Sequence, residues 1–191
     1  MRVDTFSEEV NDWSKVAAAC RRAEACGFDG FAIPEITNDP ILNAAIVANA
    51  TQRIHARTAI AVPFPRSPMV VAEQAWSTQT NPGGRSGPGP GTQVRAHNAR
   101  RFSTPWKAPR SRIVEYVKSL RAIWRCWELG ERLDYQGEHY QFSLMTPEFT
   151  PPKSNLPMVP VYLAAVRPKM IESAAGIADG LRLHFFCTKK Y

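Results

Sequence analysis

The chain has 191 residues, 44% of them hydrophobic, and a formal net charge of +7. This length and composition predict a single folded domain with a substantial core, and they exclude a disordered chain. No apolar run reaches the roughly 20 residues that cross a bilayer, and residues 1–10 lack a signal-peptide pattern, so we expect a cytoplasmic protein without a membrane partner. The positive charge favours anionic partners but does not bear on the fold.

The cysteines follow no recognisable metal or disulfide pattern. Cys20, Cys26, Cys126 and Cys187 include no CxxC pair and no zinc-type spacing with histidine. We therefore interpret all four as reduced thiols in the core, and we expect no metal centre.

Residues 1–80 alternate between strand patterns and helical patterns. The expected strands are residues 1–6, 28–34 and 54–65, the last centred on Thr58–Val62. A helical run follows each strand, and the residues predicted to cap these helices are Ser7, Asp39 and Ser67. Proline follows Asp39 and Ser67, which favours helix initiation because proline is tolerated in the first turn. Three such alternations predict a parallel α/β architecture.

Residues 81–91 break this pattern because they are rich in glycine and proline. Taken alone, the segment predicts a linker. It is not a P-loop, since no Gly-Lys-Ser/Thr follows and prolines remove the amides that such a loop presents to phosphate. Residues 93–112 then carry six basic side chains and no acid, with Phe102 and Trp106 among them. We interpret this stretch as a loop for an anionic ligand rather than for nucleic acid, because no nucleic-acid-binding motif accompanies it.

The second half of the chain begins with its clearest helical pattern, over residues 110–129, with one apolar face and Gly130 after its end. Residues 133–142 alternate in a way that predicts a small hairpin, and a proline-rich connector follows. The last expected strands are residues 159–166 and 181–186. A turn and a helix over residues 171–180 lie between them, which makes half of a βαβ unit.

The turn of this unit is the predicted phosphate site. The first amides of such a helix point toward whatever lies beyond the carboxyl end of the strand, and a phosphate is a common occupant. We expect backbone amides to bind it, with two basic side chains as charge partners. The residues of this expected site are Ala165, Val166, Arg167, Pro168, Lys169 and Met170.

Several segments occur in the order found in one enzyme family. They are GFDGFAIPE (27–35), NDPIL (38–42), TAIAV (58–62), PRSPMVVAEQAW (65–76), GTQVRAH (91–97), RRFSTPW (100–106), VYLAAVRPKM (161–170) and ADG (178–180). On these segments the chain resembles the luciferase-like monooxygenase family, and more closely its branch that depends on the deazaflavin coenzyme F420.

The resemblance implies an α/β fold: an incomplete (β/α)8 TIM barrel, with about six of eight strands and outer helices, as one domain over residues 1–191 and truncated at its C-terminal side. It further implies an oxidoreductase that uses F420, or alternatively FMN, for hydride transfer or oxygenation of a small organic substrate. An inactive barrel fragment that acts at most as an interaction partner is the alternative, and homo-oligomerisation stays open.

The resemblance also implies site residues. The catalytic candidates are Glu35, His97 and His184, whose plainer interpretations are a turn carboxylate, a surface residue and a core histidine. Besides the turn residues above, the implied cofactor contacts are Glu35, Asp39, Ala59, Ile60 and Gly91. Asp39 is equally explained as a helix cap, and many relatives have a cis peptide at the position of Ala59–Ile60.

The chain departs from the family pattern at two places. Ser86, Pro88 and Pro90 occupy the expected fourth strand, and each proline removes a donor from the ladder, so we expect this strand to be weak or absent. Arg167 stands where relatives tend to have glycine, where it would either crowd a phosphate or bind it.

Overall fold

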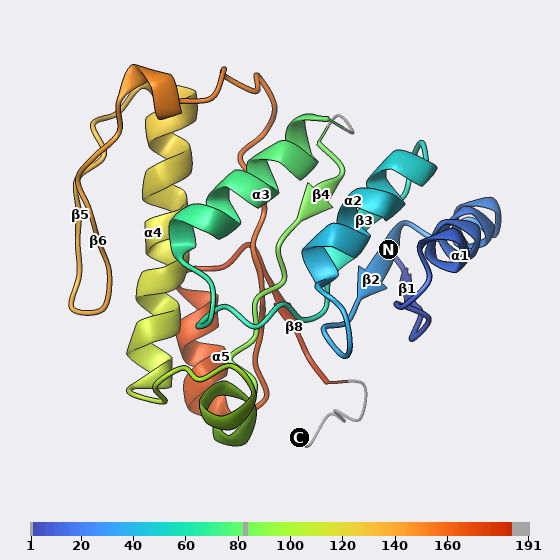
Figure 1. Cartoon of the computed structure of the whole chain (residues 1–191), viewed down its shortest axis with the longest axis horizontal. Coiled ribbons are helices and arrows are strands. Elements are labelled where there is room, and N and C mark those ends of the chain that lie inside the picture. Colours follow the sequence, from blue (N-terminus) through green and yellow to red (C-terminus); the bar gives the residue numbers. More distant parts are fainter. Residues whose placement is uncertain (1, 82–83, 185–191) are drawn as a thin grey trace.

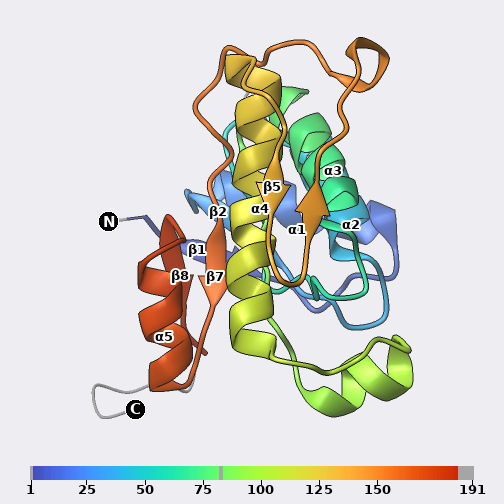
Figure 2. The same cartoon turned by 90° about the vertical axis from the view of Figure 1, so that its left-hand side faces the viewer.

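The computed structural model describes residues 2–81 and 84–184. Strands and helices alternate along the chain, and the helices lie outside the parallel strands (Figure 1). The parallel strands are β1 (Asp4–Phe6), β2 (Gly30–Ile33), β3 (His55–Thr58), β4 (Ser86–Gly87), β7 (Tyr162–Ala164) and β8 (Gly180–Arg182). The helices are α1 (Trp13–Ala25), α2 (Pro40–Ala50), α3 (Pro68–Thr80), α4 (Pro109–Leu129) and α5 (Pro168–Ala175). Short β5 (Tyr135–Gln136) and β6 (Gln141–Phe142) form the predicted hairpin, which lies against α4 (Figure 2).

The parallel strands follow one another in chain order. β1, β2, β3 and β4 form one sheet, and β7 pairs with β8. The two groups are joined through residues 88–90, because the amides of Tyr162 and Ala164 donate to the carbonyls of Pro88 (3.2 Å) and Pro90 (2.9 Å). The described chain therefore contains six parallel strands in one succession. This is the incomplete barrel that the sequence predicted, and comparison with solved structures below confirms it.

The fourth strand, which we expected to be weak or absent, is present but only two residues long. Pro88 and Pro90 face β7, where they offer only their carbonyls, and proline keeps this acceptor although it lacks the donor. Gly89 and Gly91 face the other neighbour: the amide of Ala61 donates to Gly89 (2.9 Å), and the amide of Gly91 donates to the carbonyl of Ala61 (3.1 Å). The prolines thus make the backbone hydrogen bonds to β7, and the glycines make those to Ala61 on the other side.

Two of the three predicted helix caps are confirmed. Asp39 accepts hydrogen bonds from the amides of Ile41 and Leu42, and Ser67 accepts one from Met69. The prediction for Ser7 is wrong, because the first helix begins at Trp13 and is capped by Asp12.

Residues 7–12 stay outside the helix because they are bound to the loop after β2 and to the start of α2. The carbonyl of Val10 accepts hydrogen bonds from the side chains of Asn38 (2.5 Å) and Asn43 (3.0 Å). The hydroxyl of Thr37 donates to Asn11 at 2.5 Å. These contacts span more than 25 residues of sequence, so local capping patterns do not reveal them.

The third strand, β7 and β8 are all shorter than predicted. The third strand ends at Thr58 rather than being centred on Thr58–Val62, and the next peptide, Ala59–Ile60, is cis. β7 and β8 are shorter than expected, and residues 185–186 of the last predicted strand lie outside the described residues.

The thiol prediction holds only in part. Cys20 and Cys126 are buried free thiols, whereas Cys26 is exposed at the end of α1. Cys187 lies outside the described residues.

The core has two parts on the outer side of the strands. One packs α1 and α2 against β2 and β3, and the other packs α3 and α4 against each other and against β7. The apolar face predicted for α4 is buried in the second part, where Trp76 and Trp127 meet edge to face with ring centroids 5.5 Å apart. Within residues 2–81 and 84–184, no helix is both long and apolar enough to span a bilayer.

Helical glutamates bind the backbone of later loops. Glu24 accepts hydrogen bonds from amides of residues 52–54, Glu115 from residues 138–140, and Glu128 from residues 154–155. Slight burial raises the pKa of each carboxyl, but these hydrogen bonds lower it more, so each pKa lies below the ordinary value of 4.5.

These carboxylates are expected to make the fold sensitive to acid. A carboxyl whose folded pKa is lowered contributes stability above its unfolded pKa, and this contribution is lost as pH falls through the folded value. We expect the urea concentration at the midpoint of unfolding to decrease as the pH is lowered below about 4.5. Glu24→Gln, Glu115→Gln and Glu128→Gln should each make this decrease smaller. Glu172→Gln is the control, since this exposed carboxylate accepts no backbone hydrogen bond within the described ranges. An unchanged pH profile in all three variants would contradict the prediction.

Candidate functional site

The loops after the parallel strands meet at the carboxyl ends of the strands, in the lower part of Figure 1. A row of backbone hydrogen bonds connects them. The amide of Glu35 donates to the carbonyl of Ile60 (3.2 Å), and the amide of Gly91 donates to the carbonyl of Ala61 (3.1 Å). Further along, the amide of Ala165 donates to the carbonyl of Arg182 (3.2 Å). Several positions expected to bind a cofactor therefore lie along one edge of the sheet.

Glu35 and Asp39 are brought together by Arg66, which follows the third strand. The Arg66 guanidinium lies 3.0 Å from Glu35 Oε2 and 2.8 Å from Asp39 Oδ2. Glu35 Oε2 also accepts a hydrogen bond from the amide of Val62 (2.7 Å), and Arg66 donates to the carbonyl of Val62 (2.7 Å). The side chains of Glu35 and Arg66 are only 3% and 14% exposed. The carboxylate of Glu35 is thus enclosed in an ion-pair network.

The same network shifts the pKa values of Asp39 and Arg66. Burial raises the pKa of Asp39, but hydrogen bonds from Arg66 and from two helix amides lower it more, so it lies below its ordinary value. Burial lowers the pKa of Arg66, and its hydrogen bonds to Glu35 and Asp39 raise it by more. Arg66 is thereby held charged between two carboxylates. The sequence analysis did not identify Arg66 as a site residue, although it directly precedes the predicted helix start at Ser67-Pro68.

Gly91 packs against Ile60, which directly follows Ala59 in the chain. The peptide bond between Ala59 and Ile60 is cis. A Cβ built on Gly91 would lie 2.7 Å from Ile60 Cδ1, so only glycine fits here without moving the isoleucine. The backbone at Gly91 therefore lies directly against the side chain of Ile60, and both residues lie at the carboxyl ends of the strands.

The turn between β7 and α5 presents amides beyond the strand end. Among the residues that the structure describes, the amides of Val166, Arg167 and Lys169 have no hydrogen-bond acceptor. Pro168 has no amide hydrogen, and the amide of Met170 already donates to the carbonyl of Arg167 (2.9 Å). The site therefore offers three amides rather than the full predicted run. The side chains of Arg167 and Lys169 are exposed beside them, a donor set that suits a phosphate.

His97 and His184 are placed on two further segments. His97 opens a π-helical turn, His97–Arg101, and its side chain is exposed. His184 lies two residues beyond the end of β8, not on the strand, and it is also exposed. Neither histidine belongs to the buried network around Glu35, and their catalytic roles stay predictions.

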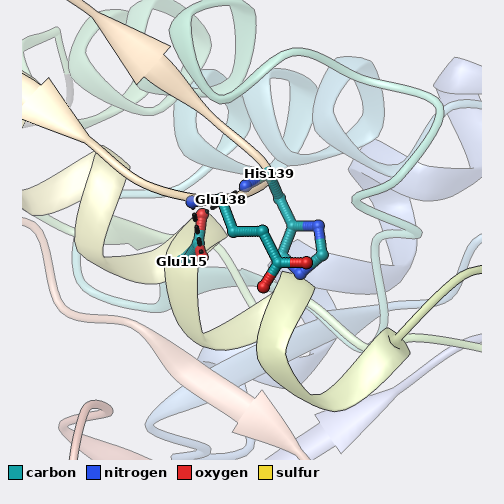
Figure 3. A group of neighbouring side chains, drawn as sticks. All are labelled: Glu115, Glu138 and His139. Carbon is teal, nitrogen blue, oxygen red and sulfur yellow. Dashed lines mark hydrogen bonds between the residues drawn. The ribbon is translucent and has the colours of Figure 1, made fainter.

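A separate group consists of three residues of metal-ligating types, Glu115, Glu138 and His139, whose ligand atoms lie within 4.8 Å of one another (Figure 3). The Glu115 carboxylate already accepts hydrogen bonds from the amides of Glu138 (3.1 Å) and His139 (2.7 Å). The ring of His139 lies 2.9 Å from the hydroxyl of Ser111. We interpret the group as a clamp that holds the hairpin against α4.

Parallel strands with outer helices, and loops gathered at the carboxyl ends of those strands, define a protein of the TIM-barrel class. Its sequence adds the family. The chain belongs to the luciferase-like monooxygenase family, whose model matches residues 1–191.

Its relatives are longer proteins. The chain is 41% identical over 181 residues to the uncharacterized protein Rv1360 of Mycobacterium tuberculosis, covering 95% of this chain and 53% of that protein. It is 28% identical over 174 residues to a 5,10-methylenetetrahydromethanopterin reductase of Methanolobus tindarius, covering 89% and 50%. The chain thus spans about half the length of the curated relatives it matches.

Solved structures share the fold at low identity. The coenzyme F420 dependent tetrahydromethanopterin reductase from Methanopyrus kandleri gives a TM-score of 0.75 at 19% identity, covering 96% of this chain and 55% of that one. An F420-dependent secondary alcohol dehydrogenase in complex with an F420-acetone adduct gives 0.78 at 21%, covering 95% and 57%. The oxygenating constituent of 3,6-diketocamphane monooxygenase from Pseudomonas putida, in complex with FMN, gives 0.75 at 12%, covering 94% and 56%.

Proposed function

We propose that this chain forms the cofactor-binding face of an oxidoreductase that uses F420 or FMN on a small organic substrate. The observation that carries the proposal is the row of hydrogen bonds that aligns Glu35, Ile60, Gly91 and Ala165 at the carboxyl ends of the strands. Active sites of TIM-barrel enzymes lie at this end of the barrel. The family match, and structural relatives that bind F420 or FMN, support the choice of cofactor.

The residues present fit such a cofactor. The amides of Val166, Arg167 and Lys169 would hold its phosphate, and the close packing of Gly91 on Ile60 provides a wall beside the strand ends. When bound, the flavin or deazaflavin ring supplies the hydride chemistry. Glu35, enclosed by Arg66, positions the loop after β3 in this proposal rather than exchanging protons with substrate.

Binding of the cofactor is the direct test. We would titrate the whole chain with F420 and with FMN and follow the absorbance of the ring. Saturable binding of one of them is expected, about tenfold weaker in Gly91→Val because the added side chain displaces Ile60. Gly176→Ala is the control, since its new Cβ would meet only one atom, 3.9 Å away. A chain that melts cooperatively but binds neither cofactor would overturn the proposal and favour an inactive fragment.

Arg100 is expected to attract the anionic part of the cofactor. It is exposed in the basic stretch of residues 93–112, whereas neighbouring Arg101 donates to the carbonyl of Ile36 (2.6 Å) and so has a structural partner. Arg100→Ser should weaken binding about threefold at low ionic strength and have little effect at high ionic strength. Arg132→Ser removes the same charge from the exposed segment after α4 and should leave binding unchanged. Equal effects of the two variants would show that net charge alone is responsible.

A further inference from the structure

Arg112, in the first turn of α4, contacts three separate loops. Its Nε donates to the hydroxyl of Tyr140 (3.0 Å), one Nη donates to the carbonyl of Pro105 (3.0 Å), and the other to the carbonyl of Phe64 (3.3 Å). The guanidinium carbon also lies over the ring of Phe64, 4.5 Å from its centroid. One side chain therefore connects the loop after β3, the loop before α4, and the hairpin.

The loop before α4 lies along the rim of the candidate site. Trp106 packs against Phe64 with ring centroids 6.1 Å apart, and Phe64 lies in the same loop as Arg66. Just upstream, Arg101 donates to the carbonyl of Ile36, in the loop after β2. Residues 101–106 therefore contact the loops that follow two neighbouring strands. We call residues 102–108 the rim loop.

The hairpin supports Arg112 from the other side. The Glu115 carboxylate binds the amides at the hairpin turn, including that of Tyr140 (3.3 Å); Figure 3 shows the carboxylate beneath this turn. The Tyr140 ring packs edge to face on Tyr116, with centroids 5.6 Å apart. Its hydroxyl is thus held where it accepts from Arg112, one turn of helix away from Glu115.

We infer that Arg112 is a positioning residue that holds the rim loop against the carboxyl ends of the strands and so shapes one wall of the cofactor site. The inference rests on the proposed function for its effect on binding. Arginine suits the role because its planar fork of N–H groups reaches several acceptors at once. Lysine keeps the charge, but its three donors lie on a single nitrogen, whereas Arg112 reaches its three acceptors from three different nitrogens.

The test compares Arg112→Lys and Arg112→Met with a matched variant on the same helix. Arg121 also bridges from α4, donating to the carbonyl of Ile177 (3.1 Å) and to Asp179 (3.0 Å), and it contacts no residue of the rim loop. Arg121→Met therefore controls for the loss of a bridging arginine. Two readouts are compared with urea stability: trypsin cleavage after Lys107, identified by mass spectrometry, and the dissociation constant for F420 or FMN.

Both Arg112 variants are expected to be cut after Lys107 about tenfold faster than the wild-type chain and to bind cofactor about tenfold more weakly. Arg121→Met should lose comparable stability without either change. The inference would be overturned if Arg112→Met were cut after Lys107 at the wild-type rate, or if Arg121→Met were cut there as fast as the Arg112 variants. If the wild-type chain binds neither cofactor, the proposed function fails, while the cleavage at Lys107 still decides whether Arg112 positions the loop.

Discussion

Arg66→Met is expected to lower the free energy of unfolding by about 3–5 kcal/mol at neutral pH. The change removes the guanidinium that lies between Glu35 and Asp39 and leaves two partly or fully buried carboxylates near each other. The side chain of Glu35 is only 3% exposed, so water cannot replace the lost donors. Urea unfolding followed by circular dichroism measures the loss.

The pH dependence of the Arg66→Met variant provides a second measurement. An unpaired buried carboxyl has its folded pKa raised above the unfolded value, so its penalty is present above the folded pKa and disappears on acidification. The deficit relative to the wild-type chain should therefore shrink as pH falls. A matched variant, Arg66→Met with Glu35→Gln, removes the buried charge and should recover part of the stability. A loss below about 1 kcal/mol, typical of surface pairs, would show that the network is solvated.

Gly89→Ala is expected to destabilise the fold by about 3 kcal/mol or to prevent folding. A Cβ at this position would lie 1.9 Å from the carbonyl oxygen of Thr58, and a backbone atom in the neighbouring strand cannot turn aside as a side chain can. The Gly89 amide is also bound to the hydroxyl of Thr58 (2.7 Å), which keeps the two strands at this spacing.

The measurement for Gly89→Ala is again urea unfolding, with the amount of soluble chain as a second readout. Gly176→Ala is the matched control, because its added methyl group near the end of α5 would meet only the carbonyl oxygen of Ser173, at 3.9 Å. Similar small losses in both variants would contradict the close approach of the fourth strand to the third. A selective loss at Gly89 would support the role of glycine on that side of the strand.

Elements whose causes are local were predictable. Asp39 and Ser67 cap helices because each side chain binds amides two or three residues later, and a proline follows each of them. The face of α4 recurs at helical spacing, and Gly130 ends the helix in a left-handed conformation with φ of 74°. The prediction for Ser7 was wrong because Val10 is held by Asn38 and Asn43, which are distant in sequence.

The fourth strand shows how a local rule was incomplete. Proline was expected to make this strand weak or absent, since each proline removes a donor from the ladder. In the structure, each side of the strand uses alternate residues, and the prolines face only β7, to which they supply carbonyl acceptors. Which side of a strand a residue faces depends on the neighbour it meets, and that neighbour, Tyr162, is far along the chain.

By itself, the sequence determined the parallel α/β class, the order of strands and helices, the two Asp-Pro and Ser-Pro helix starts, and the family, because these depend on short-range patterns and ordered motifs. Only the tertiary structure decided how Arg66 encloses Glu35, how Arg112 connects three loops, and which amides of the β7–α5 turn are already bound. These arrangements join residues separated by tens of positions, and a long flexible side chain such as arginine has a partner only once packing has placed one within reach.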